Sequence, residues 1–225
     1  MIELIYIHIP KTGGTSFIET LKDVYGSEMV GNFWSMFPGN EGQLKDSQSH
    51  VYHKHTEFRA NIREAFGKTG YRVIHGHIPL WMLDGIYTDV PRITWLRDPF
   101  EQMLSWLFYC GKLNVKQQRA VSPRELVYTQ EYRNMQSFYT GGSLSNFAFV
   151  GTLENYKRDL KRLACIMGWE GVEPKHLYKT EYGEKYRKEL AEDQDFRRLV
   201  RCLNSRDVAL YNRAVEEKVY GRLAF

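Results

Sequence analysis

The chain has 225 residues, of which 43% are hydrophobic, enough to bury a continuous core, and we expect residues 1–225 to form a single domain. No apolar run is long enough to cross a bilayer and the N-terminus lacks the layout of a signal peptide, so the expected location is cytoplasmic. The net charge of +4 fits a protein that binds polyanionic nucleotides better than one that binds nucleic acid, and the three cysteines match no disulfide or zinc framework.

The first predicted strand, residues 2–9, runs directly into the sequence His-Ile-Pro-Lys-Thr-Gly-Gly-Thr-Ser at residues 8–16. Two adjacent glycines allow a tight turn whose N–H groups point inward, and the helix expected over residues 15–25 has a partial positive charge at its N-terminus. The lysine comes before the glycines, unlike the Gly-x4-Gly-Lys-Ser/Thr loop of nucleoside triphosphatases. The pattern predicts a phosphate-binding turn made by Lys11, Thr12, Gly13, Gly14, Thr15 and Ser16.

The next segments differ sharply in character. Periodicity is lost over residues 31–49, where we expect a mobile loop that contributes to an acceptor cleft. His50, His53 and His55 follow, but their spacing matches no zinc motif, and they are interpreted as part of a solvated loop. A second short strand is expected over residues 71–75.

A third buried strand is expected over residues 92–96, and it ends in a set of helix-start signals. Asp98 suits the N-cap, the next residue is proline, and Glu101 stands at the capping-box position. Ser105 lies eight residues after Arg97, about two helical turns along. One anion could therefore contact both Arg97 and Ser105.

The remaining elements alternate in type. A strand is expected over residues 146–150, and a helix from about Thr152 that ends at Gly168. Other expected elements are a helix from Ser122, a strand over residues 176–178 and two charged helices over residues 190–219. This alternation predicts an α/β fold with a mainly parallel sheet flanked by helices. Ligands bind at the carboxyl ends of such strands, where the sequence places Lys11, His77, Arg97 and Glu154.

These segments together resemble the sulfotransferases that use 3′-phosphoadenosine-5′-phosphosulfate (PAPS), and most closely the carbohydrate branch that includes the heparan uronosyl 2-O-sulfotransferases. Residues 8–16 resemble that family's 5′-phosphosulfate loop, and Arg97 with Ser105 resembles its 3′-phosphate site. The chain departs from the family at Gln102, where a second basic residue is often found. Four more fragments resemble the same branch in chain order: residues 74–79, 134–136, 150–155 and 207–212.

The resemblance implies a P-loop-like three-layer sandwich and transfer of a sulfuryl group from PAPS, without a metal, to an acceptor hydroxyl of a carbohydrate. It implies that His77, the second histidine of a His-Gly-His fragment, is the general base, and that His75 positions His77 or the acceptor. Lys11 would stabilise the bridging oxygen of the leaving phosphate. Membrane-anchored members carry a transmembrane stem, whereas only seven residues precede His8 here, so a soluble protein is expected.

Two other functions stay open on the sequence alone. A small-molecule kinase with a modified phosphate loop is disfavoured because Lys11 precedes the glycines and no aspartate at a strand end is clearly placed to hold magnesium. A non-catalytic module that binds a nucleotide or a glycan is disfavoured by the presence of Lys11 and His77. Glu154 suits either a site role or a favourable contact with a helix dipole.

Overall fold

The architecture is an α/β fold around a fully parallel sheet in the part of the chain that is described. The computed structural model describes residues 1–36, 62, 64–116, 123–129, 132–175 and 184–216. The strand order is β2-β3-β1-β4-β5. At the centre Ile7 pairs with Gly76 on one side and with Thr94 on the other. The strands are β1 (Leu4–Ile7), β2 (Val30–Asn32), β3 (Val73–Gly76), β4 (Arg92–Leu96) and β5 (Phe149–Thr152).

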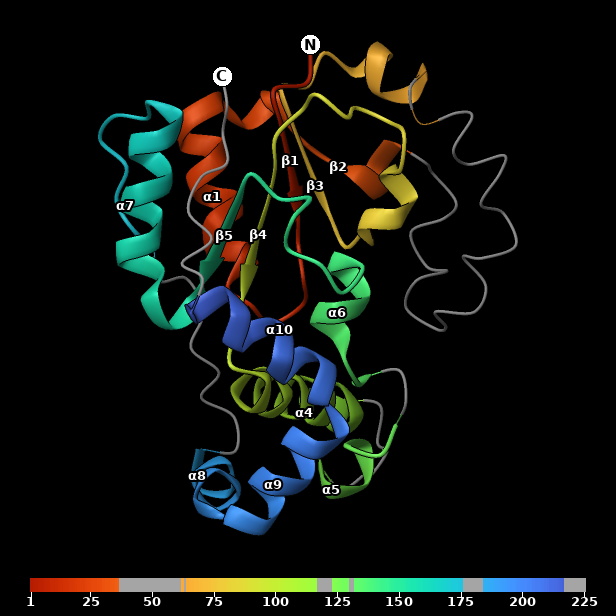
Figure 1. The fold of residues 1–225 in the computed structure, drawn as a ribbon, viewed down its shortest axis with the longest axis vertical. Helices are drawn as coiled ribbons and strands as arrows, with labels where there is room; N and C mark the ends of the chain where they lie inside the picture. The colour runs from red at the N-terminus through yellow and green to blue at the C-terminus, as the bar shows by residue number, and fades with distance from the viewer. Residues whose placement is uncertain (37–61, 63, 117–122, 130–131, 176–183, 217–225) are drawn as a thin grey trace.

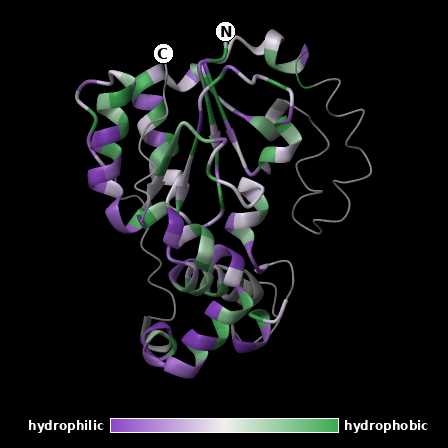
Figure 2. Ribbon diagram, viewed as in Figure 1, coloured by the Kyte–Doolittle hydropathy of each residue, from purple (hydrophilic) through white to green (hydrophobic). Residues whose placement is uncertain are grey.

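Helices cover both faces of the sheet and make three layers, which confirms the predicted fold class (Figure 1). On one face α1 (Gly14–Tyr25) and α7 (Tyr156–Met167) bury their apolar sides against Tyr6 and Trp95. The other face is covered by elements far apart in sequence: η4 (Leu80–Leu83), α6 (Met135–Thr140) and α10 (Ser205–Glu216). Figure 2 shows mainly hydrophobic colouring along the strands, as expected for parallel strands buried on both sides.

A separate group of helices lies beyond the carboxyl ends of the strands (Figure 1). Its apolar centre includes Phe100 and Leu104 from α4, Leu190 from α8, and Phe196 from α9. Because α4 begins directly after β4, this group of helices lies next to the carboxyl edge of the sheet, where ligands are expected to bind. The helices are α4 (Pro99–Lys116), α5 (Pro123–Leu126), α8 (Glu184–Glu192) and α9 (Gln194–Leu203).

The prediction of a loop over residues 31–49 is wrong at its start, because residues 31 and 32 belong to the edge strand β2. The strand has three residues, and a Cβ added at Gly31 would lie 2.1 Å from the ring of Tyr71. Glycine is therefore needed for close packing here, which removes the alternation that marks a strand in sequence. Residues 37–49, the three histidines after them and the strand expected over residues 176–178 lie outside the described residues.

The C-terminal part also differs from the two helices expected over residues 190–219. Three helices are described there, because Asp193 caps α9 by accepting a hydrogen bond from the Phe196 N–H, and Asn204 separates α9 from α10. By contrast, α7 ends at Gly168 as expected. Among the described residues, no helix combines the length and the apolar character that a membrane crossing needs.

Candidate functional site

The turn between β1 and α1 has an unusual backbone. Lys11 has a φ of 64° and Gly13 a φ of 87°, both in the left-handed region that non-glycine residues rarely adopt. The Thr12 hydroxyl is buried and donates to the carbonyl of Ile9 at 2.9 Å, so it braces the turn from within. Backbone strain of this kind is common where main-chain N–H groups gather around an anion, as the sequence predicts here.

The start of α1 packs closely on His8, which is half-buried. A Cβ added at Gly14 would meet the His8 ring at 2.0 Å and the Tyr6 hydroxyl at 2.6 Å, so only glycine fits at this position. Thr15 is exposed and Ser16 half-buried in the first turn of the helix. Their position at a helix N-terminus is the one at which an anion is stabilised.

The two anion-binding segments predicted from sequence meet in the structure. The Arg97 guanidinium donates through Nη1 to the backbone carbonyl of Lys11 at 3.2 Å, although 86 residues separate them. The Lys11 ammonium lies 4.5 Å from the centre of the Tyr109 ring, on the helix that begins after Arg97. Lys11 and Arg97 therefore belong to one site at the carboxyl edge of β1 and β4.

Side chains on α4 occupy different parts of this site. Gln102, which stands where the family often has a basic residue, is 4% exposed, and its Nε2 donates to the carbonyl of Pro10 at 2.8 Å. Gln102 therefore supports the turn before Lys11. Ser105 is buried one turn further along α4, on the same helix that carries Tyr109.

The backbone of Arg97 is held by one buried amide side chain. Gln136 Oε1 accepts from the Arg97 N–H at 3.0 Å, and Gln136 Nε2 donates to the Arg97 carbonyl at 2.8 Å. The side chain of Arg97 is 17% exposed, and burial lowers its pKa, although the nearby Glu101 carboxylate at 3.9 Å opposes that shift. A partly dehydrated guanidinium at a fixed position is well suited to bind a phosphate.

Asp98 caps α4, but the predicted capping box does not form. Asp98 Oδ1 accepts from the N–H groups of Phe100 and Glu101 at 3.0 and 3.1 Å. The Asp98 N–H, however, donates to Glu154 Oε1 at 2.9 Å, whereas Glu101 turns toward arginines. The other carboxylate oxygen of Asp98, Oδ2, lies 3.2 Å from Arg201 Nη1, so Asp98 also forms an ion pair in addition to capping α4. The capping box is absent because Glu154, which follows the neighbouring strand β5, accepts from the Asp98 N–H in place of Glu101.

A reciprocal clamp joins α6 to α10. Asp207 Oδ2 and Oδ1 accept from the N–H groups of Gln136 and Ser137 at 2.9 and 2.7 Å, while Asn134 Oδ1 accepts from the N–H groups of Arg206 and Asp207 at 3.0 and 3.3 Å. Each helix start is thus capped by a side chain of the other. Burial raises the pKa of Asp207, and its hydrogen bonds oppose this shift. The clamp orients Gln136, and therefore the backbone of Arg97.

Glu154 makes a second link between distant segments. Its Oε2 accepts from the Tyr211 hydroxyl at 2.9 Å, while its other oxygen holds the Asp98 N–H. Burial and the Glu154 charge both raise the pKa of Tyr211, so the phenol stays protonated as the donor. Glu154 therefore positions the turn at the start of α4. Sequence reasoning placed Glu154 at the site but missed the roles of Gln136, Asp207 and Tyr211, which depend on contacts across the fold.

Three histidines lie at the carboxyl ends of β1 and β3. The rings of His8 and His77 are 4.3 Å apart, and His77 Nδ1 lies 2.6 Å from the His8 carbonyl. Because a carbonyl only accepts, Nδ1 carries the proton and Nε2 keeps its lone pair. Burial lowers the pKa of His77, and burial together with the His77 charge lowers that of His75 to about 4. His8 is half-buried, and loss of hydration together with the charges of His77, His75 and Lys11 holds its pKa well below its ordinary value.

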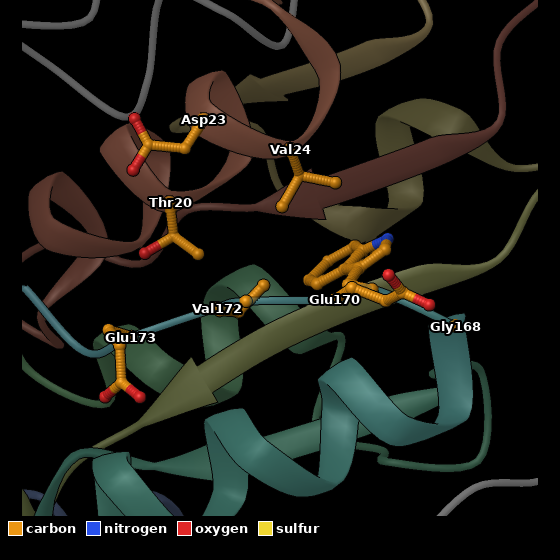
Figure 3. A pocket seen from close by; sticks show the side chains of 9 residues that line it. Thr20, Asp23, Val24, Gly168, Glu170, Val172 and Glu173 are labelled. Carbon is orange, nitrogen blue, oxygen red and sulfur yellow. The ribbon is translucent and has the colours of Figure 1, made fainter.

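A cavity of about 390 Å³ lies away from this edge, between α1 and the segment that follows α7 (Figure 3). Asp23, Glu170 and Glu173 line it, and Asp23 pairs with Lys175. Three carboxylates make this cavity a poor place for an anionic ligand. Within the part of the chain that the structure describes, no three His, Cys, Asp or Glu side chains lie in position to hold a metal ion.

No protein-family model and no curated protein matches the sequence. Among solved structures, the crystal structure of a sulfotransferase from Alicyclobacillus acidocaldarius is similar, with 17% sequence identity and a TM-score of 0.45. The similarity covers 95% of this chain and 99% of that chain. A likeness of this degree leaves the function to be argued from the residues themselves.

Proposed function

We propose that this chain is a sulfotransferase that moves the sulfuryl group of PAPS to a hydroxyl of a carbohydrate acceptor. The observation that carries the proposal is the hydrogen bond from Arg97 to the Lys11 carbonyl, which joins the two anion-binding segments. PAPS has a phosphosulfate at one end of its ribose and a phosphate at the 3′ position. A site with two separate anion-binding segments on one sheet edge fits such a ligand.

In the proposed donor site, the backbone N–H groups of residues 12–16 bind the 5′-phosphate. Lys11 neutralises the charge that grows on the bridging oxygen as the bond to sulfur breaks. Arg97 and Ser105 bind the 3′-phosphate, a role supported by the burial of Ser105, the limited exposure of the Arg97 side chain and the fixed backbone of Arg97. PAPS supplies the activated sulfuryl group, and the proposal includes no metal.

His77 is the proposed general base. Its Nδ1–H donates to the His8 carbonyl, so Nε2 can accept the proton of the acceptor hydroxyl. The acceptor oxygen then bonds to sulfur as the sulfur–oxygen bond to the phosphate breaks, giving a sulfate ester and 3′-phosphoadenosine-5′-phosphate. The lowered pKa of His77 keeps the ring neutral at physiological pH, as a base requires. His75, which its lowered pKa also keeps neutral, is proposed to position His77 or the acceptor.

Calorimetric titration tests the donor site without knowledge of the acceptor. We expect 3′-phosphoadenosine-5′-phosphate to bind more tightly than 5′-AMP, and magnesium-ATP to bind weakly. A preference for magnesium-ATP would indicate a kinase instead. No binding of any nucleotide would favour a non-catalytic module.

Two variants separate the proposed roles. His77→Ala should bind 3′-phosphoadenosine-5′-phosphate as the wild type does but transfer sulfate about 100-fold or more slowly to a glycan acceptor. Arg97→Ala should weaken the binding of 3′-phosphoadenosine-5′-phosphate and leave the affinity for 5′-AMP nearly unchanged. Transfer by His77→Ala at the wild-type rate would show that another group is the base.

A further inference from the structure

A second arginine lies beside Arg97, on a helix from the C-terminal part of the chain. Leu190 of α8 is 1% exposed and packs in one cluster with Phe100 and Leu104 of α4. This packing determines which face of α8 lies against α4. Arg187 lies three residues before Leu190, so it is on the same face one turn earlier. Packing of α8 therefore brings Arg187 to the start of α4.

Glu101 bridges the two guanidinium groups. Its Oε2 lies 3.9 Å from Arg97 Nη2 and 3.6 Å from Arg187 Nη2. Both distances exceed the 2.7–2.9 Å or so of a charge-assisted hydrogen bond, so neither arginine is tightly bound by Glu101. The positive charge of Arg187 also lowers the pKa of Arg97, which places the two cations within electrostatic reach of each other.

Within the cluster of Arg97, Glu101 and Arg187, two positive charges share one negative charge. Two arginines share one carboxylate, and their side chains are 17% and 30% exposed, so both are partly dehydrated yet reachable. Two further carboxylates act on Arg97, but both have other partners: Asp98, the N-cap of α4, lies 3.2 Å from Arg201, and Glu154 accepts from the Asp98 N–H and the Tyr211 hydroxyl. A phosphate monoester, with three oxygens and up to two negative charges, could accept from both guanidinium groups at once.

We infer that Arg187 is a second phosphate-binding arginine of the 3′-phosphate subsite, and that Glu101 occupies the position between the arginines until the nucleotide replaces it. This inference rests on the proposed function, because it assigns the ligand of Arg187 from the donor named there. Arg187 would then help to distinguish nucleotides that carry a 3′-phosphate from those that lack it. The rival explanation is that Arg187 only fastens α8 to α4 through Glu101.

The test compares the dissociation constants of 3′-phosphoadenosine-5′-phosphate and 5′-AMP by calorimetry in the wild type and in variants. We expect Arg187→Ala to raise the dissociation constant of 3′-phosphoadenosine-5′-phosphate about 10- to 100-fold and to leave that of 5′-AMP unchanged. Lys188→Ala is the matched control, because Lys188 is the adjacent, exposed residue of α8 and pairs only loosely, at 3.9 Å, with Glu192. It should change neither constant.

Glu101→Gln separates the inference from the purely structural explanation. If Glu101 competes with the phosphate, removing the charge of Glu101 should tighten the binding of 3′-phosphoadenosine-5′-phosphate severalfold. If Glu101 and Arg187 only fasten two helices together, the variant should lower the melting temperature without tightening the nucleotide, and the inference would be wrong. Should Arg187→Ala fail to fold, Arg187→Lys keeps the charge but loses the two-pronged geometry, and it should still weaken the 3′-phosphate nucleotide.

The outcomes for the inference and for the proposed function are distinct. A wild type that prefers the 3′-phosphate, with the same preference in both Arg187 variants, would overturn the role of Arg187 and leave the sulfotransferase proposal standing. A wild type that shows no preference for the 3′-phosphate would overturn both.

Discussion

His75 should make the stability of the protein depend on pH. The residue lies on β3 with 7% of its surface exposed, and its Nδ1 is buried with no hydrogen-bond partner among the described residues. Burial and the nearby His77 lower its pKa from 6.5 to about 4. Between these values the unfolded chain binds a proton that the folded chain does not. Stability that is present above pH 6.5 is therefore lost as the pH falls toward 4.

The size of this effect follows from the pKa difference. Each unit of pKa difference is worth about 1.36 kcal/mol, so a fall from 6.5 to about 4 corresponds to roughly 3 kcal/mol once the unfolded chain is fully protonated. At about pH 4.5 most of this loss, on the order of 2.5 kcal/mol, should already be present. His75→Leu has a similar volume and does not titrate, so it should lose that much less stability on acidification.

Urea unfolding of the wild type and His75→Leu at about pH 7.5 and about pH 4.5 measures the difference. Carboxylates also titrate in this interval, but they do so in both proteins, and the comparison cancels them. We expect the free energy of unfolding of the wild type to fall by 2 to 3 kcal/mol or so more than that of the variant. Equal losses in the two proteins would refute the reasoning, because they would mean that His75 is protonated as easily in the folded state as in the unfolded state.

Three further predictions concern the site. The acid limb of the kcat/KM profile should have its midpoint below pH 6.5, because burial lowers the pKa of His77 and the base must be neutral; a midpoint above 6.5 would contradict this role. Gly14→Ala should lower the free energy of unfolding in urea by about 1–3 kcal/mol by pushing on His8, whereas Gly67→Ala, whose Cβ meets no atom within 4 Å, should not destabilise the protein. Gln136→Leu should remove the partner of the Arg97 N–H and C=O, which are partly buried, and should lower the free energy of unfolding by about 0.5–1.5 kcal/mol for each group. It should also weaken the binding of 3′-phosphoadenosine-5′-phosphate roughly tenfold by calorimetry; unchanged affinity would exclude a positioning role.

Elements marked by strong local signals were predicted with nearly correct bounds. The strand over residues 92–96 is β4, and the Asp-Pro pair after it starts α4, because capping depends on side chains within three residues of the helix end. The strand β5 begins three residues later than expected, at Phe149, since the first residues of the predicted run lie in the turn before the strand. The strand β2 was missed because its neighbour Tyr71 requires glycine and not a β-branched residue.

Some residues of the candidate site could be predicted from the sequence, but their supporting contacts could not. Lys11 and Arg97 could be placed at one sheet edge from their positions after predicted strands, and the structure joins them by a hydrogen bond. The support for Arg97 was not predictable, because Gln136 lies 39 residues away in sequence, and the fragment at residues 134–136, although it resembles the family, indicates no partner for Gln136. Arg187 lies in a strongly charged helix, where any one arginine resembles a solvated surface residue.

Signals that act over a few residues, such as a glycine turn, an N-cap or an apolar run, were readable in the linear chain because their physics is local. They specify the parallel α/β order and the glycine turn at residues 11–14 for which anion binding is predicted. Contacts such as Asp207 to the start of α6, Glu154 to Tyr211 and Glu101 to Arg187 form only after packing has set the helices in place. Hydrogen bonds and charge pairs need an alignment within a few tenths of an ångström to a few ångströms, and only the folded core supplies it.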